Sequence, residues 1–84
     1  MNTILTASVR RLVCPGTVRV VRDSYLVVGH RTEFTATFSP GDAIIVGEES
    51  REVVAVENDY ELRVRGPFSR GGSGWPYGVA TTSV

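Results

Sequence analysis

The chain has no lysine, and among its 84 residues it has only one cysteine and one histidine. Because Cys14 stands alone, it forms neither an intrachain disulfide nor a thiolate metal cluster. His30 is the only base that could activate Cys14 as a nucleophile, and no local sequence signature joins the two. One histidine without a second nitrogen or sulfur ligand is also a poor metal site. We therefore expect a buried structural Cys14, and neither metal nor cofactor.

The chain also lacks net charge, since nine acidic side chains balance nine arginines. This removes the long-range attraction on which nucleic-acid binders depend, so we expect no nucleic-acid partner. No apolar run is long enough to cross a bilayer, so we expect no membrane partner. The charges alternate by segment: five arginines against two acids in residues 1–40, seven acids against one arginine in 41–61, and three arginines in 62–84.

Two interpretations of this alternation stay open. Strands from different segments can become neighbours and pair their opposite charges. Alternatively, one acidic and one basic patch survive folding, and copies or partner subunits dock through them. The exclusive use of arginine follows either from genome composition or from the preference of interfaces for its planar, bidentate fork, which favours an assembly role.

Acidic residues are also absent from residues 1–22. The arginine and hydroxyl content of residues 1–12 is typical of an organelle transit peptide, and its apolar positions fit a short amphipathic helix. We expect residues 1–14 to be an uncleaved arm that becomes ordered on its own domain or on a neighbour. Residues 15–84 then form one β-domain with a thin core, because so short a chain buries only roughly 60% of its unfolded surface.

The remaining sequence consists of short β-rich runs that are separated by Gly, Pro, Asn and Asp. They predict an all-β fold, a small antiparallel sandwich or partly open barrel of six to seven short strands. The runs are residues 17–22, 25–28, 43–46, 51–56, 60–65 and 77–81. The continuous apolar run 43–46 predicts a central strand buried on both faces, so Ile45→Asp is expected to unfold the domain.

Three connecting segments carry further expectations. Residues 30–38 fit a helical face or a strand face, and their threonines favour an extended segment with a short helical turn near Phe38. Asp42 is expected to accept backbone N–H groups of its own turn. The run Ser69–Gly74 predicts a flexible loop, and it lacks the lysine and the helix of a phosphate-binding loop.

Contacts with partners are expected from the arm and from this glycine loop. The arm offers Arg10, Arg11 and Leu12, and the loop region offers Arg70, Trp75 and Tyr77. Aromatic rings beside a loop can stack on sugars, so glycan binding is an alternative; the other interpretation is that Trp75 and Tyr77 cap one end of a barrel. The carboxylates fall on solvent-facing strand positions and turns, without the contrasting environments of a general acid and base, so we expect no enzyme.

The order of these motifs resembles a known kind of module. Gly16-Thr17-Val18, a strand ending in Gly29, then Pro40-Gly41-Asp42, Asn58-Asp59-Tyr60-Glu61-Leu62 and Gly72-Ser73-Gly74 before Tyr77 are similar to small β-modules of bacteriophage tail-fibre, baseplate and other virion proteins. The resemblance covers residues 16–80. The chain departs from it in His30-Arg31-Thr32, where the modules have Gly-Thr, and in an unusually apolar strand 25–28, which suggests that the arm or another subunit covers this face.

The resemblance implies a non-catalytic structural subunit of a virion, such as a head decoration, tail or fibre-associated protein. Its partners would be other protein subunits, including copies of itself, and its location the virion. The alternatives are an accessory subunit of a cellular or organellar complex, located inside the cell, and a carbohydrate- or receptor-binding module.

Overall fold

The computed structural model describes residues 8–9, 12–80 and 82–83, with side chains described for residues 14–80. Strands dominate this part of the chain, and one helix of a single turn interrupts them. The elements are β1 (Ser8–Val9), β2 (Leu12–Val13), β3 (Thr17–Val20), β4 (Leu26–His30), α1 (Phe34–Thr37), β5 (Ala43–Val46), β6 (Glu49–Asn58), β7 (Glu61–Val64), β8 (Gly72–Trp75), β9 (Tyr77–Ala80) and β10 (Thr82–Ser83).

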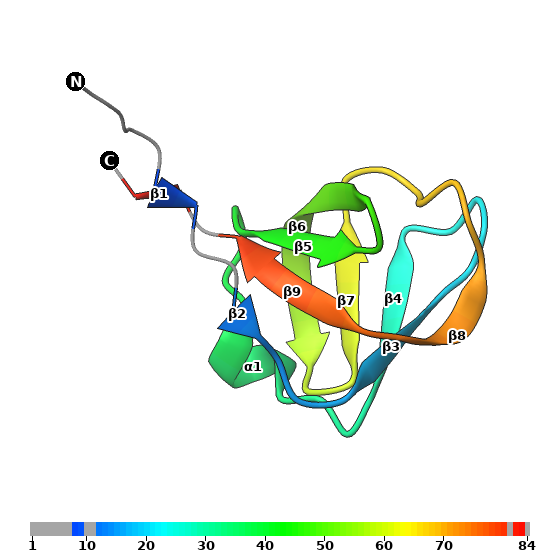
Figure 1. Cartoon of the computed structure of the whole chain (residues 1–84), viewed down its shortest axis with the longest axis horizontal. Coiled ribbons are helices and arrows are strands. Elements are labelled where there is room, and N and C mark those ends of the chain that lie inside the picture. The colour runs from blue at the N-terminus through cyan, green and yellow to red at the C-terminus, as the bar shows by residue number, and fades with distance from the viewer. Residues whose placement is uncertain (1–7, 10–11, 81, 84) are drawn as a thin grey trace.

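Eight of the described strands form one curled antiparallel sheet in the order β2-β9-β5-β6-β7-β4-β3-β8. Only Pro76 separates β8 from β9, so this bent segment pairs with β3 at one end of the sheet and with β5 near the other. The sheet therefore curls back on itself as a small, partly open barrel (Figure 1). The predicted all-β class is confirmed, and the eight strands of the sheet become seven when β8 and β9 are counted as one.

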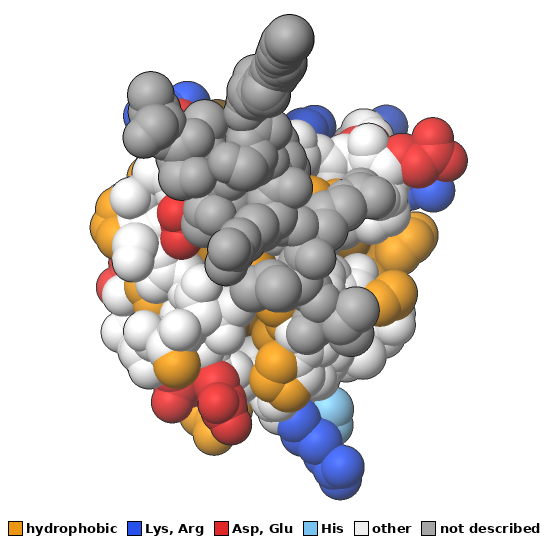
Figure 2. Space-filling model, turned by 60° about the vertical axis from the view of Figure 1, so that its left-hand side comes forward, with side chains coloured by type: hydrophobic (Ala, Val, Ile, Leu, Met, Phe, Trp, Pro, Cys, Tyr) orange, Lys and Arg blue, Asp and Glu red, His pale blue; other side chains and the backbone are white. Residues whose placement is uncertain are grey.

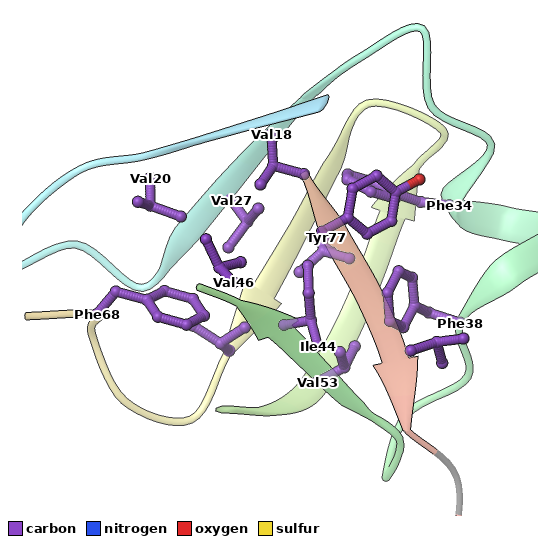
Figure 3. Packing of buried hydrophobic residues seen from close by; sticks show 13 residues of the cluster. Val18, Val20, Val27, Phe34, Phe38, Ile44, Val46, Val53, Phe68 and Tyr77 are labelled. Carbon is purple, nitrogen blue, oxygen red and sulfur yellow. The ribbon is translucent and has the colours of Figure 1, made fainter. Parts of the chain in front are cut away.

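Thirteen buried hydrophobic side chains fill the barrel (Figure 3). Phe34 lies edge-on to both Phe38 and Tyr77, with ring centroids 5.8 and 5.9 Å apart. The strand β7 alternates between exposed and buried residues, so its amphipathic pattern is confirmed. The core residues are Val18, Val20, Val27, Phe34, Phe38, Ile44, Val46, Val53, Leu62, Val64, Phe68, Tyr77 and Val79.

The strand β5 is central, as predicted, because β9 and β6 flank it. Its burial differs from the prediction. Ile44 and Val46 are buried, whereas Ala43 and Ile45 on the other face are only partly covered. A continuous apolar run here marks one buried face and one half-covered face, because no second layer of structure packs over the outside of β5 in the described part of the chain.

The segment Phe34–Thr37 is helical, so the predicted short helical turn near Phe38 is present, but it replaces the extended conformation that was favoured for the rest of this segment. Two aromatic rings decide this: Phe34 and Phe38 lie one turn apart and both enter the core. Asp59 holds the first turn from outside, since its Oδ1 accepts a hydrogen bond of 3.0 Å from the Thr35 N–H. Its carbonyl oxygen accepts a further one of 3.3 Å from the Phe34 N–H. These partners are distant in sequence and override the β propensity of the threonines.

The glycine run is also more ordered than predicted, because Gly72–Trp75 forms β8 instead of a flexible loop. Val18 pairs with Trp75 and Val20 with Gly72, so two residues of β8 lie opposite Arg19 in a bulge. Backbone pairing requires no side chains, and Gly72 and Gly74 supply the positive φ angles of 130° and 78° that this path needs.

Opposite charges pair across neighbouring strands, as one interpretation of the charge pattern predicted. Arg63 Nε lies 3.0 Å from a carboxylate oxygen of Glu57, and Arg65 Nε lies 2.9 Å from one of Glu52. The first pair joins β7 to β6, and the second joins the residue that follows β7 to β6. At the turn before β5, Ser39 N–H donates to Asp42 Oδ2 over 2.9 Å, which confirms the predicted role of that carboxylate.

The strands at both ends of the described chain pair with strands of the same chain. The strand β2 adds to the edge of β9, and β1 pairs with β10 to form a two-stranded ribbon that projects away from the barrel (Figure 1). The described part of the predicted arm therefore contacts strands of its own chain.

Candidate functional site

Tyr77 lies in the core and not on a contact surface. Only 6% of the residue is exposed, and its hydroxyl donates a hydrogen bond of 2.7 Å to the carbonyl oxygen of Pro15. Burial raises the pKa of the Tyr77 phenol to about 12. This ring closes the barrel where the N-terminal segment enters it, and it presents no face to a partner or to a sugar.

Trp75, the last residue of β8, is partly exposed. It lines a small apolar hollow together with Gly47, Phe68 and Arg70. The free volume of this hollow is about 10 Å³. That is room for about one water molecule and not for a sugar ring. Arg70 is exposed at the rim and remains accessible to a partner. The arrangement fits the capping interpretation of Trp75 better than stacking on a glycan.

The arm residues predicted to make contacts are only partly described. Arg10 and Arg11 lie outside the described residues. Leu12 lies in β2, where its backbone pairs with Val79 of β9.

Cys14 and His30 do not offer a reactive pair. Cys14 is half-buried and packs against the core, and this burial raises the pKa of its thiol, which disfavours the nucleophilic thiolate. His30 is exposed at the end of β4. Within the described part of the chain, no group of three or more His, Cys, Asp or Glu side chains is placed to hold a metal ion.

The carboxylates with displaced pKa values are stabilised in the ionised form. Hydrogen bonds from Ser69 lower the pKa of Glu49, and those from Arg65 lower the pKa of Glu52. Thr35 lowers the pKa of Asp59 in the same way. Glu49 and Glu52 form ion pairs with Arg51 and Arg65, and Asp59 binds the first turn of α1.

A broad concave feature of the described surface lies along β3 and β8, hereafter the β3–β8 groove. It consists of two shallow hollows of about 380 and 470 Å³ that share Arg19 and Ser73. The glycines of β8 leave this surface without side chains, and the bulge opposite Arg19 bends the strand. The lining residues are Thr17, Val18, Arg19, Val20, Val21, Arg22, Val28, Gly29, His30, Gly71, Gly72, Ser73 and Gly74.

The charge of the β3–β8 groove is exclusively basic. Its lining contains Arg19, Arg22 and His30 and no carboxylate. Neither arginine forms an ion pair with any described residue, in contrast to Arg63 in β7 and Arg65 directly after it. Sequence reasoning missed these two arginines, although the signal was present: they belong to a segment with a large excess of arginine over acid.

Beside the groove, beyond β4, the turn between β6 and β7 presents an aromatic side chain flanked by acids. We call residues 58–61 the β6–β7 tip. Tyr60 is 56% exposed there, between Asp59 and Glu61. The tip is rigid: Asn58 Oδ1 accepts from the Tyr60 N–H over 2.8 Å, and the Tyr60 carbonyl accepts from the Gly29 N–H over 2.8 Å.

The surface keeps acidic and basic groups apart as well as pairing some of them. On the face shown in Figure 2, an acidic group and a basic group stand separately at the bottom of the molecule. A third shallow hollow of about 310 Å³ on the outer face is lined by Tyr25, Val54, Arg63, Val64 and Arg65. Paired charges and separated charged groups therefore both occur, on different parts of the surface.

No family model, curated protein or solved structure matched the chain. None of the helices in the described residues has the length and hydrophobicity needed to cross a membrane.

Proposed function

We propose that this protein is a non-catalytic structural subunit of a large assembly, a virion protein of the head, tail or fibre. The observation that carries the proposal is the β1–β10 ribbon, in which both ends of the described chain pair and project from the barrel (Figure 1). A two-stranded ribbon is marginally stable alone in water, so a neighbouring subunit that packs on it supplies the missing contacts.

The exposed side chains support the same role. Among the residues with described side chains, four large hydrophobic ones are exposed: Val21, Tyr25, Val54 and Tyr60. Aromatic side chains of this kind are enriched where subunits meet. The basic β3–β8 groove and the acidic β6–β7 tip add polar surfaces of opposite sign. The order of turn motifs that resembles virion β-modules favours a virus particle over a cellular complex.

The direct test is the composition of particles. Virus particles from the source should contain this chain in a fixed ratio to the major structural proteins, measured by quantitative mass spectrometry after gradient purification. A chain that stays in the soluble fraction and never co-purifies with particles would refute the proposal.

The role of the ribbon is tested by removing residues 1–9, which deletes β1 and leaves β2 and its pairing with β9 intact. The truncated barrel should keep its circular dichroism spectrum and lose incorporation into particles. A matched control replaces residues 1–9 with a Gly-Ser segment of equal length, which keeps the chain length and removes the sequence. Full incorporation of both variants would show that the ribbon makes no essential contact.

A further inference from the structure

We propose that the protein associates with a second copy of itself, the β6–β7 tip of one copy occupying the β3–β8 groove of the other. This inference rests on the proposed structural role and names the partner for one surface: an identical chain. It is carried by the charge and shape of two exposed surfaces that lack ion pairs among the described residues.

The groove is shaped for an acidic, protruding ligand. Arg19 and Arg22 lie along it without ion pairs among the described residues, and no carboxylate lines it. A side-chain methyl group at Gly74 would meet no atom within 4 Å, so the backbone at this one position is open to contact. A groove with basic walls and a glycine floor admits a bulky ring while its arginines bind the flanking carboxylates.

The tip has the matching properties. Tyr60 is exposed and lies in sequence between Asp59 and Glu61. Their carboxylates accept hydrogen bonds from Thr35 and Asn58 but form no ion pair among the described residues. Glu33 precedes α1, whose Thr35 N–H donates to Asp59. The hydrogen bonds to Asn58 and Gly29 fix the backbone of Tyr60 before binding, so little conformational entropy is lost on association. A rigid tyrosine at the centre of a contact is a common binding hot spot.

The arrangement of the two surfaces suits self-association. Only β4 separates β7, which follows the tip, from β3, which lines the groove. Two copies can therefore exchange tip and groove reciprocally, which is the symmetry of a two-fold dimer. Two arginines of the groove, Arg19 and Arg22, have no ion pair among the described residues. The acidic tip of a second copy would neutralise them, so no foreign ligand is needed.

The first experiment measures the association of the purified full chain by sedimentation velocity up to about 1 mM, at low and high salt. We expect concentration-dependent association that high salt weakens. Tyr60→Ala should weaken it about tenfold or more, as expected for a central anchor. Tyr25→Ala is the matched control, because Tyr25 is 55% exposed elsewhere and its removal should leave the association constant unchanged.

The second experiment exchanges the charges. The groove variant is Arg19→Glu/Arg22→Glu. The second variant, called the tip variant, is Glu33→Arg/Glu61→Arg, which reverses Glu61 of the tip and Glu33 directly before α1. Each variant alone should be monomeric, because its groove and tip carry charge of the same sign. An equal mixture should associate again, because each groove then meets a tip of opposite charge. Arg65→Glu and Glu48→Arg reverse exposed charges outside both surfaces and should associate like the unmodified chain.

The outcomes separate this inference from the proposed function. A chain that stays monomeric at all concentrations, or folded charge variants that associate normally, would overturn the inference, as would failure of the mixture to associate. Binding of dextran sulfate to a monomeric chain through Arg19 would also overturn it, in favour of a polyanion ligand. Absence of the chain from particles would instead refute the proposed function, whatever the association state.

Discussion

The close packing around Gly29 leaves no room for a larger residue at this position. A Cβ atom placed there would lie 2.0 Å from Thr32 Oγ1 and 2.8 Å from the end of the Phe34 ring. Thr32 is itself buried and donates a hydrogen bond of 2.5 Å to the carbonyl oxygen of Asp59. The close contact therefore holds together β4, the segment before α1, and the β6–β7 tip.

We expect Gly29→Ala to lower the free energy of unfolding by about 1–3 kcal/mol, the usual cost of forcing atoms into a filled space. Gly66→Ala is the matched control, since its Cβ would come no closer than 3.9 Å to the Arg51 side chain. Urea unfolding followed by tryptophan fluorescence measures both. Equal stability of the two variants would mean that the segment around Thr32 moves aside freely.

Tyr77 makes a prediction at alkaline pH. Burial raises the pKa of its phenol from 10.0 to about 12 in the folded state. The unfolded chain therefore releases this proton first, and the folded state loses stability as pH rises from about 10 to about 12. Cys14 acts in the same direction, because burial also raises the pKa of its thiol, so the measurement is made in a Cys14→Ala background.

In that background, thermal unfolding temperatures should fall between pH 10 and pH 12, and the fall should be smaller in Tyr77→Phe. At pH 7 the Phe variant should lose about 1 kcal/mol, since it lacks the hydrogen bond to Pro15. An identical alkaline decline in both proteins would show that Tyr77 is not the group responsible.

At the scale of the element, β5 separates two neighbouring isoleucines. Ile44 is fully buried in the core, whereas Ile45 lies on the half-covered outer face. Ile44→Asp should unfold the domain, because an unpaired buried carboxylate costs several kcal/mol and the total stability of small domains starts at about 5 kcal/mol. Ile45→Asp should leave the barrel folded, contrary to the expectation from the apolar run alone. Circular dichroism of both variants checks this, and unfolding by Ile45→Asp would show that another layer covers β5.

Elements with strong local signals were predictable. Alternation in β7 and the turn at Asp42 gave the strand, its exposed face and the hydrogen bond to Ser39. The strand β8 was not predicted, and α1 was predicted only as a short turn near Phe38, because the decisive partners of both elements are distant in sequence. Asp59 holds α1, and Val18 and Val20 pair with β8.

At the scale of the whole molecule, stability should depend on acidic pH in a defined direction. Glu49, Glu52 and Asp59 have pKa values lowered in the folded state by hydrogen bonds and, for Glu52, by the arginine beside it. The unfolded chain therefore binds protons first, and stability is constant near neutral pH and declines as pH falls below the ordinary values of 4.5 and 3.8.

A pH series of urea unfolding curves tests this prediction. Asp59→Asn should be less stable than the unmodified chain at pH 7 and should show a shallower decline toward pH 3, because it has one fewer carboxylate to protonate. Glu48→Gln, which changes a carboxylate with no ion pair in the described structure, should follow the unmodified curve. A parallel decline in Asp59→Asn would exclude Asp59 as a contributor.

The sequence by itself determined the all-β class, the turns and most strands, because alternation, proline and glycine act over a few residues. It also showed that arginine and acid are segregated along the chain. Only the tertiary structure decided which charges meet: β6 and β7 neutralise each other, whereas Arg19 and Arg22 fall beside a strand of glycines that offers no carboxylate. It also placed Tyr77 in the core and Tyr60 on a rigid tip, since burial depends on the partners that the curled sheet brings together.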